Sequence, residues 1–158
     1  MAGVASGLAA AATGTACGTS ATATPPGPGG TLGLGIVGLL VHDLQRSLDF
    51  YRTLWLAIPR QVSGDNFRLT LPNGQVFFWD SDTIVRSFDP KWTPGSGGRR
   101  VVLEFGFATA DAVDAMYRRL VAEGHPSYFE AQDLYGARYA IVLDPDGNQV
   151  SLRYPLSS

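Results

Sequence analysis

Cysteine, histidine and clustered positive charge are all scarce in this sequence of 158 residues. Its single cysteine, Cys17, excludes an internal disulfide and a zinc site built from cysteines. The net charge is −2 and no run of Lys or Arg appears, so no nucleic-acid partner is expected. No apolar run is long enough to cross a membrane as a helix, so no membrane span is expected either.

Charged residues are also absent from the N-terminal part, where the first one is Asp43. Residues 1–33 consist mainly of Ala, Thr, Gly and Pro, which offer too little large apolar surface to offset the entropy lost on ordering. Hydrophobic residues make up 45% of the whole chain, which is enough for one core. The sequence therefore predicts a flexible leader over 1–33 and a single folded domain over 34–155.

The leader leaves two hypotheses about location. The simpler one is a cytoplasmic protein with a disordered leader. The alternative is an exported lipoprotein anchored through Cys17, because the stretch "GTAC" loosely resembles a lipoprotein cleavage site.

The first part of the folded domain, residues 34–80, predicts a strand, a helix and a hairpin. The apolar run "LGIVGLLV" is typical of a buried strand, and Asp43 then has the character of an N-cap. Alternation on both sides of a Pro-Asn-Gly turn in "NFRLTLPNGQVFFWD" predicts the hairpin. Residues 81–99 are rich in turn formers and are expected to be a connector.

The second part, residues 100–155, repeats this order. The strand "VVLEFGFA" is followed by Asp111 as the expected N-cap and by a helix that ends near Gly124. The stretch "RYAIVLDPDGNQVSLRY" then predicts two strands joined by a tight turn, because Pro presets one backbone angle and Gly and Asn tolerate a positive φ.

The two parts can be laid over each other. Asp43 falls on Asp111, and "GQVFF" falls on "NQVSL", which gives an internal repeat of about 70 residues. Each half is expected to form a strand, a helix and three further strands. This predicts an α+β fold in which one helix covers the outer face of each half and the other faces meet across a cavity.

These segments, in this order, resemble the vicinal-oxygen-chelate superfamily, which includes glyoxalase I, bleomycin-resistance proteins and extradiol dioxygenases. The resemblance covers about residues 34–155 and implies two βαβββ modules that form a half-closed, mixed-sheet cup around one site. It also implies a small-molecule ligand and, often, a homodimer.

The resemblance further implies four metal-ligand positions on the strands of the cup. Transferred through the caps and the repeat, these positions fall at Ile36, Phe77, Glu104 and Ser151. A single carboxylate does not supply the three or four ligands that a divalent ion requires. The two histidines, His42 and His125, lie near a helix start and in a loop, so dioxygenase chemistry does not fit. No bound metal and no cofactor are expected.

Strand alternation predicts what lines the cup instead. The inward side chains are expected to be aromatic and polar: Arg68, Thr70, Phe77, Trp79, Glu104, Arg138, Ser151 and Arg153, with Tyr135 at the mouth. The predicted ligand-binding set is Arg68, Phe77, Trp79, Glu104, Tyr135, Arg138 and Ser151. Aromatic walls favour a flat ligand, and arginines favour an acidic one.

Plainer interpretations stay open for the same residues. Glu104 is expected to need a positive partner, so an internal ion pair with Arg68 or Arg138 competes with ligand binding. Phe77 and Trp79 could simply fill the core.

Three functions therefore compete. The first is a metal-free small-molecule-binding protein of the bleomycin-resistance type, for an aromatic or acidic compound. The second is a glyoxalase-like lyase or isomerase that recruits metal ligands from other positions; a metal-free variant would use Glu104 as its general base, and no other catalytic residue is predicted. The third is a structural module whose cup is filled.

Overall fold

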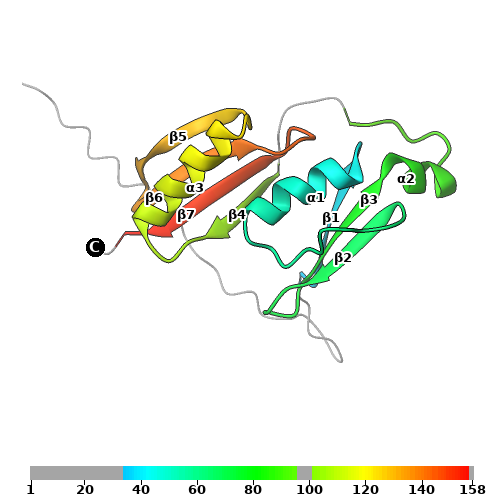
Figure 1. Ribbon diagram of the computed structural model, residues 1–158, viewed down its shortest axis with the longest axis horizontal. Coiled ribbons are helices and arrows are strands. Elements are labelled where there is room, and N and C mark those ends of the chain that lie inside the picture. The colour runs from blue at the N-terminus through cyan, green and yellow to red at the C-terminus, as the bar shows by residue number, and fades with distance from the viewer. Residues whose placement is uncertain (1–33, 96–100, 157–158) are drawn as a thin grey trace, which may run out of the picture. The chain divides into compact units, whose positions relative to one another are not determined.

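The computed structural model describes residues 34–95 and 101–156, which form two sheets and three helices (Figure 1). The leader expected over 1–33 lies outside the described residues. None of the helices in the described ranges has the length and apolar character that a membrane crossing requires.

The first module contains a three-stranded sheet in the order β1-β3-β2. Strand β1 is parallel to β3, and β2 is antiparallel to it. The elements are β1 (Ile36–Val41), α1 (Leu44–Thr53), β2 (Asn66–Thr70), β3 (Val76–Ser81) and α2 (Asp82–Phe88).

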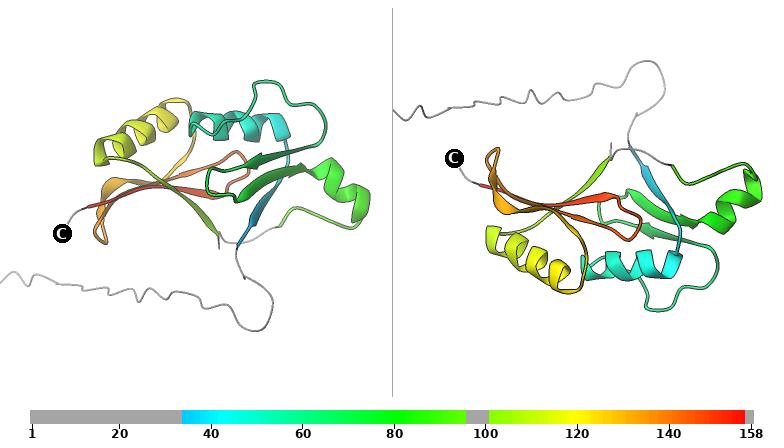
Figure 2. Two further views of the ribbon diagram at one scale, coloured as in Figure 1. Left: turned by 90° about the horizontal axis from the view of Figure 1, so that it is seen from below. Right: turned by 90° about the horizontal axis from the view of Figure 1, so that it is seen from above.

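The second module contains a four-stranded sheet in the order β4-β7-β6-β5. Strands β4 and β7 are parallel, and the other two pairs are antiparallel. The elements are β4 (Val102–Gly106), α3 (Ala110–Ala122), β5 (Ser127–Leu134), β6 (Ala137–Leu143) and β7 (Gln149–Pro155). Helices α1 and α3 lie on the same side of the two sheets (Figure 2).

The predicted α+β class with two mixed sheets and a helix on each is confirmed. The first sheet differs in detail, because its described residues form three strands where four were expected. Between α1 and β2, the side chain of Arg52 donates to the carbonyls of Ile58 and Pro59, at 3.3 and 2.9 Å from Nε. Since proline also lacks an N–H, this segment is poorly suited to a sheet ladder.

The connector also differs from its prediction, because α2 lies within it. Ser81 caps this helix through its hydroxyl, which accepts a hydrogen bond from the N–H of Ile84 at 3.5 Å. The short apolar pattern that follows buries Val85, so one turn-rich stretch contains a packed helix.

The N-cap predicted for the first helix is confirmed, and the one predicted for the second is wrong. The carboxylate of Asp43 accepts a backbone N–H at 3.0 Å. In the second module the cap is Thr109, whose hydroxyl accepts from the N–H of Ala112 at 3.1 Å. Asp111 lies in the first turn, where a negative charge suits the helix dipole.

One core runs under both helices. It combines Leu48 and Phe50 of α1 with Val113 and Met116 of α3, and all four side chains are buried. Burying a side chain of this size contributes about 1.5–3 kcal/mol. Strand β1 is only half buried, because it alternates between core and solvent, so the fully buried strand expected there is wrong.

The turn between β6 and β7 is organised around a buried carboxylate. Asp144 is 3% exposed and accepts four hydrogen bonds. Three come from its own turn: the N–H groups of Asp146 and Asn148, at 3.0 and 2.7 Å, and the side-chain amide of Asn148, at 2.9 Å. The fourth comes from the hydroxyl of Tyr51 on α1, at 2.9 Å. The φ of Gly147 is 83°, so this residue has the positive φ that the turn was predicted to contain.

Removing the Tyr51 hydroxyl should therefore weaken the contact between α1 and the β6–β7 turn. Burial raises the pKa of Tyr51 well above its ordinary value, and Asp144 adds to the rise, so the hydroxyl remains a donor. A hydrogen bond to a charged group contributes about 1.5–3 kcal/mol, and Tyr51→Phe should lower the free energy of unfolding by about that amount in urea titrations. Tyr117→Phe is the matched control, because its hydrogen bond to Ser127 is exposed. Equal losses in both variants would contradict this role.

A contact between His42, just after β1, and the first residue of α2 depends on pH. The ring Nδ1 of His42 lies 3.0 Å from a carboxylate oxygen of Asp82, and this contact raises the pKa of His42. Because the folded pKa exceeds the unfolded value of 6.5, the stabilisation is fully present below pH 6.5 and is lost as pH rises through the folded pKa.

The stability difference between the protein and His42→Gln should accordingly be largest below pH 6.5 and shrink above it, in unfolding curves recorded across this range. His125 provides the opposite case, because burial lowers its pKa. The protein should lose stability relative to His125→Gln as pH falls below 6.5. A His42→Gln difference that does not change with pH would show that the pairing contributes nothing.

Candidate functional site

The sheet registers show which positions of the two modules correspond. In the second module, Glu104 of β4 pairs with Ser151 of β7. Counted from the observed N-caps, Gly38 occupies the position in β1 that Glu104 occupies in β4. Gly38 pairs with Phe78 of β3, so the four corresponding positions are Gly38, Phe78, Glu104 and Ser151.

The sequence-based transfer to Ile36 and Phe77 is therefore wrong for the first module. Because Asp111 was taken as the N-cap instead of Thr109, the position in β1 was placed at Ile36 instead of Gly38. A shift of two residues keeps a position on the same face of the strand. The alignment of "GQVFF" with "NQVSL" placed the position in β3 at Phe77 instead of Phe78. This error of one residue moves the side chain to the opposite face of the strand. Phe77 consequently points to the helix side, and Ile36 is exposed at the start of its strand.

Phe77 and Trp79 belong to the core. Both are buried, and both rings lie 5.4 Å from the ring of Tyr51 on α1. The expectation that they line the cup is wrong, and the plainer interpretation as core residues agrees with their positions. Their strand partners are Leu69 and Phe67, which also pack against the core on the helix side. Residues paired directly across strands share a face, so the register alone could have exposed the error.

Arg138 also points to the helix side, contrary to the prediction. Its Nε and Nη2 donate to the two carboxylate oxygens of Asp114 on α3, at 2.6 and 2.9 Å, and Nη1 donates to Asp133 at 3.1 Å. The face of β6 away from α3 instead presents Tyr139 and Ile141, since Ala140 packs in the core.

On the face away from α3, three polar side chains come together. The hydroxyl of Ser151 donates to one carboxylate oxygen of Glu104 at 3.5 Å, and Nε of Arg153 lies 3.8 Å from the other. Ser151 is buried, whereas the side chains of Glu104 and Arg153 are 47% and 39% exposed. The positive partner expected for Glu104 is thus Arg153, not Arg138 or Arg68. Contacts of this length and exposure are weak, so both charged groups can turn to another partner.

The equivalent face of the first module is filled by an aromatic ring. A Cβ at Gly38 would lie 2.0 Å from the ring of Phe78, so the ring sits directly over the glycine. Arg68 is the partner of Phe78 on the neighbouring strand β2, and its guanidinium lies 5.5 Å from the centre of the same ring. At Gly38 and Phe78 this half of the cup therefore offers a stacked Arg–Phe surface and no side chain that could bind a metal.

A pocket of about 210 Å³ adjoins Arg153 and is called the hairpin pocket here. It is lined by Leu134, Tyr135, Ala137, Tyr139 and Arg153. Tyr135 and Gly136 form the tight turn between β5 and β6, with φ of 50° and 71°. Two successive positive φ angles are typical of a type I′ turn, where Asn and Gly are usual and Tyr is strained. Tyr135 is 78% exposed at the pocket mouth.

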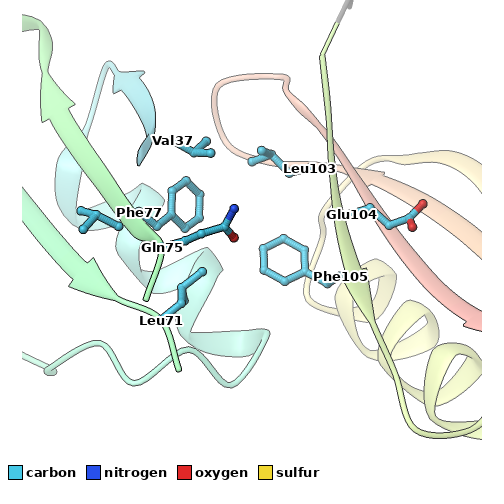
Figure 3. A pocket seen from close by; sticks show the side chains of 8 residues that line it. Val37, Leu71, Gln75, Phe77, Leu103, Glu104 and Phe105 are labelled. Atoms are coloured by element: carbon cyan, nitrogen blue, oxygen red, sulfur yellow. The ribbon is translucent and has the colours of Figure 1, made fainter. Parts of the chain in front are cut away.

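A second pocket, the inter-module pocket, has a volume of about 140 Å³ and lies between the two sheets (Figure 3). Its lining is Val37, Leu71, Gln75, Val76, Phe77, Leu103, Glu104 and Phe105. Figure 3 shows Phe77 and Phe105 on opposite sides of it, whereas the carboxylate of Glu104 points away.

The residues at the corresponding positions do not fit the metal that the family resemblance implies. Only Glu104 among Gly38, Phe78, Glu104 and Ser151 is a strong ligand for a divalent ion, and its carboxylate already faces Arg153. Across 34–95 and 101–156, no group of three or more His, Cys, Asp or Glu side chains is arranged to hold a metal ion.

Comparisons with known proteins agree with this fold. Residues 33–152 match the family model described as the Glyoxalase/Bleomycin resistance protein/Dioxygenase superfamily. No curated protein matches the sequence.

Solved structures are also similar. A glyoxalase/bleomycin resistance protein/dioxygenase family enzyme from Burkholderia phytofirmans PsJN is 19% identical, with a TM-score of 0.66 over 78% of this chain and 98% of its own. A glyoxalase/bleomycin resistance protein/dioxygenase from Nocardioides is 22% identical, with a TM-score of 0.64 over 82% and 87%. A glyoxalase-related enzyme from Fulvimarina pelagi is 20% identical, with a TM-score of 0.66 over 78% and 88%. At these identities the likeness shows the fold alone.

The packing of Phe78 over Gly38 predicts a large effect of one methyl group. Gly38→Ala should lower the free energy of unfolding by about 1–3 kcal/mol, because the ring must move to admit the Cβ. Gly106→Ala is the matched control on β4, where a Cβ meets no atom within 4 Å. In a Phe78→Ala background the cost of Gly38→Ala should disappear. A cost that persists in that background would show that the ring is not its cause.

Proposed function

Because the chain belongs to the glyoxalase/bleomycin resistance protein/dioxygenase superfamily, we propose that it is a small-molecule-binding protein of this fold. The ligand is an aromatic carboxylate that binds in the hairpin pocket without a metal ion. The observation that carries this proposal is that one arginine and two tyrosines, Arg153, Tyr135 and Tyr139, line a single pocket beside Glu104.

Arg153 is the group that holds the carboxylate. Its guanidinium can donate two parallel hydrogen bonds, which match the geometry of a carboxylate. A hydrogen bond to a charged group contributes about 1.5–3 kcal/mol, whereas an exposed ion pair contributes about 0–1 kcal/mol. The 3.8 Å contact with Glu104 is of the second kind, so exchanging it for a ligand carboxylate is favourable. Glu104 keeps the hydrogen bond from Ser151 after the exchange.

The aromatic part of the ligand is held by tyrosine rings. Tyr139 is oriented by an edge contact with Phe129, whose ring centre lies 6.1 Å away. The two-residue turn places Tyr135 at the mouth of the pocket. Stacking of aromatic rings contributes about 0.5–1.5 kcal/mol beyond the area buried, which favours a flat ligand over an aliphatic acid of equal size.

The donor set on this face supports the metal-free form of the proposal. A glyoxalase-like lyase or isomerase would need ligands beyond Glu104, and Gly38, Phe78 and Ser151 do not provide them. The filled-cup hypothesis describes the first module, where Phe78 covers Gly38, but the second module keeps its pocket.

Titration with 2-naphthoate, followed by calorimetry or tyrosine fluorescence, tests the proposal. Arg153→Ala should weaken binding at least tenfold, because it removes a charge-assisted pair. Tyr139→Leu should weaken binding several-fold by removing the stacking wall. Arg119→Ala is the matched control, because Arg119 pairs with Glu123 on the surface of α3 and does not line the pocket.

Equal affinities in the protein, Arg153→Ala and Arg119→Ala would contradict the site. Elemental analysis after dialysis against Zn, Ni, Co, Mn and Fe(II) tests the metal-free statement separately. One firmly held ion per chain that is lost in Glu104→Ala would favour the lyase or isomerase instead.

A further inference from the structure

We propose a second binding site, in the inter-module pocket, for a single uncharged aromatic ring. It differs from the hairpin pocket in its lining and in the chemistry that it can accept. No step of this inference depends on Arg153 or on the aromatic carboxylate proposed above.

The size and lining of the pocket suit a ring of this kind. Its volume is about 140 Å³, and Val37, Phe77, Leu103 and Phe105 supply most of its wall (Figure 3). A protein cavity of about 150 Å³ lined by Leu, Ile and Phe stays dry and takes up benzene. The inter-module pocket matches that case in volume and in the kind of side chain, although it opens to the surface.

The two phenylalanines are held in place from behind. The ring of Tyr51 contacts both of them, with ring centres 5.4 Å from Phe77 and 6.4 Å from Phe105. Tyr51 is itself fixed by its hydrogen bond to Asp144. A ring that enters between Phe77 and Phe105 therefore meets two preorganised aromatic walls, and edge or offset contacts with them are favourable.

The two polar side chains at the pocket, Gln75 and Glu104, already have partners, which disfavours an ionised ligand. The side-chain amide of Gln75 donates to the carbonyl of Leu34 at 2.9 Å and accepts from Asn73 at 2.8 Å. The carboxylate of Glu104 points away, towards Ser151 (Figure 3). A carboxylate or an ammonium group would lose its hydration here without a partner, so only a neutral ring gains free energy on entry.

The location of the pocket makes room for such a ring without breaking a sheet. It lies beside β1 and β4, each of which is an outer strand of its own sheet. The two sheets share no ladder across this position, so an inserted ring displaces no backbone hydrogen bond.

The test uses fluorobenzene as the probe and ¹⁹F NMR of the full chain as the readout. The probe should broaden and shift on addition of protein, and toluene should displace it, whereas benzoate should not. Leu103→Phe places an extra ring in the pocket and should weaken binding at least tenfold. Val102→Phe is the matched control, because it adds the same ring at the neighbouring position, on the opposite face of β4.

Several outcomes decide the question. Equal binding in Leu103→Phe and Val102→Phe, or displacement by benzoate at the same concentration as toluene, would overturn the proposal. If Leu103→Phe does not fold, Val37→Leu fills the pocket from the other wall, and unchanged binding in that variant would overturn it equally. Arg153→Ala should bind fluorobenzene as the unmodified protein does. That variant therefore separates failure of this site from failure of the carboxylate site.

Discussion

The hydrogen bond from Tyr51 to Asp144 joins the two halves of the molecule and sets what lies on each face. Asp144 is a buried carboxylate, which is tolerated only because four donors satisfy it. Three of these donors close the β6–β7 turn, and that turn determines the register of β7 against β6. The register in turn places Val150 in the core and Ser151 beside Glu104. The fourth donor ties this arrangement to α1, whose Tyr51 ring also orders the aromatic side chains around it.

The two modules share an architecture but differ in chemistry at the two positions that correspond between them, Gly38 and Phe78 in the first and Glu104 and Ser151 in the second. In the first, Phe78 packs over Gly38 and the corresponding space is filled. In the second, the corresponding residues Glu104 and Ser151 are polar, and Arg153 lies beside Glu104. The recognition chemistry that we propose is consequently one-sided. A repeat fold of this type does not need two equivalent half-sites, since the filled half still stabilises the sheet through packing.

Much of the fold could be predicted from the sequence, because its signals are local. Asp43 as an N-cap and the glycine-containing β6–β7 turn each depend on a few neighbouring residues. The site could be predicted only in part, because it depends on register. A slip of one residue on β3 turned Phe77 and Trp79 towards the wrong face, and the same kind of error turned Arg138. The pairing of Arg138 with Asp114 is a long-range choice among several carboxylates, and strand alternation carries no information about it.

The strained turn at Tyr135 has a consequence for the history of the protein. A type I′ turn would be more stable with Asn or Gly at this position, because an aromatic residue with φ of 50° carries a conformational cost. A single substitution to Asn or Gly would remove this cost and raise the stability of the protein. If the hairpin pocket binds its ligand as proposed, the contribution of Tyr135 to binding offsets the cost of keeping it. In related proteins that no longer bind the ligand, the tyrosine would then be lost, so its replacement would indicate loss of the binding function.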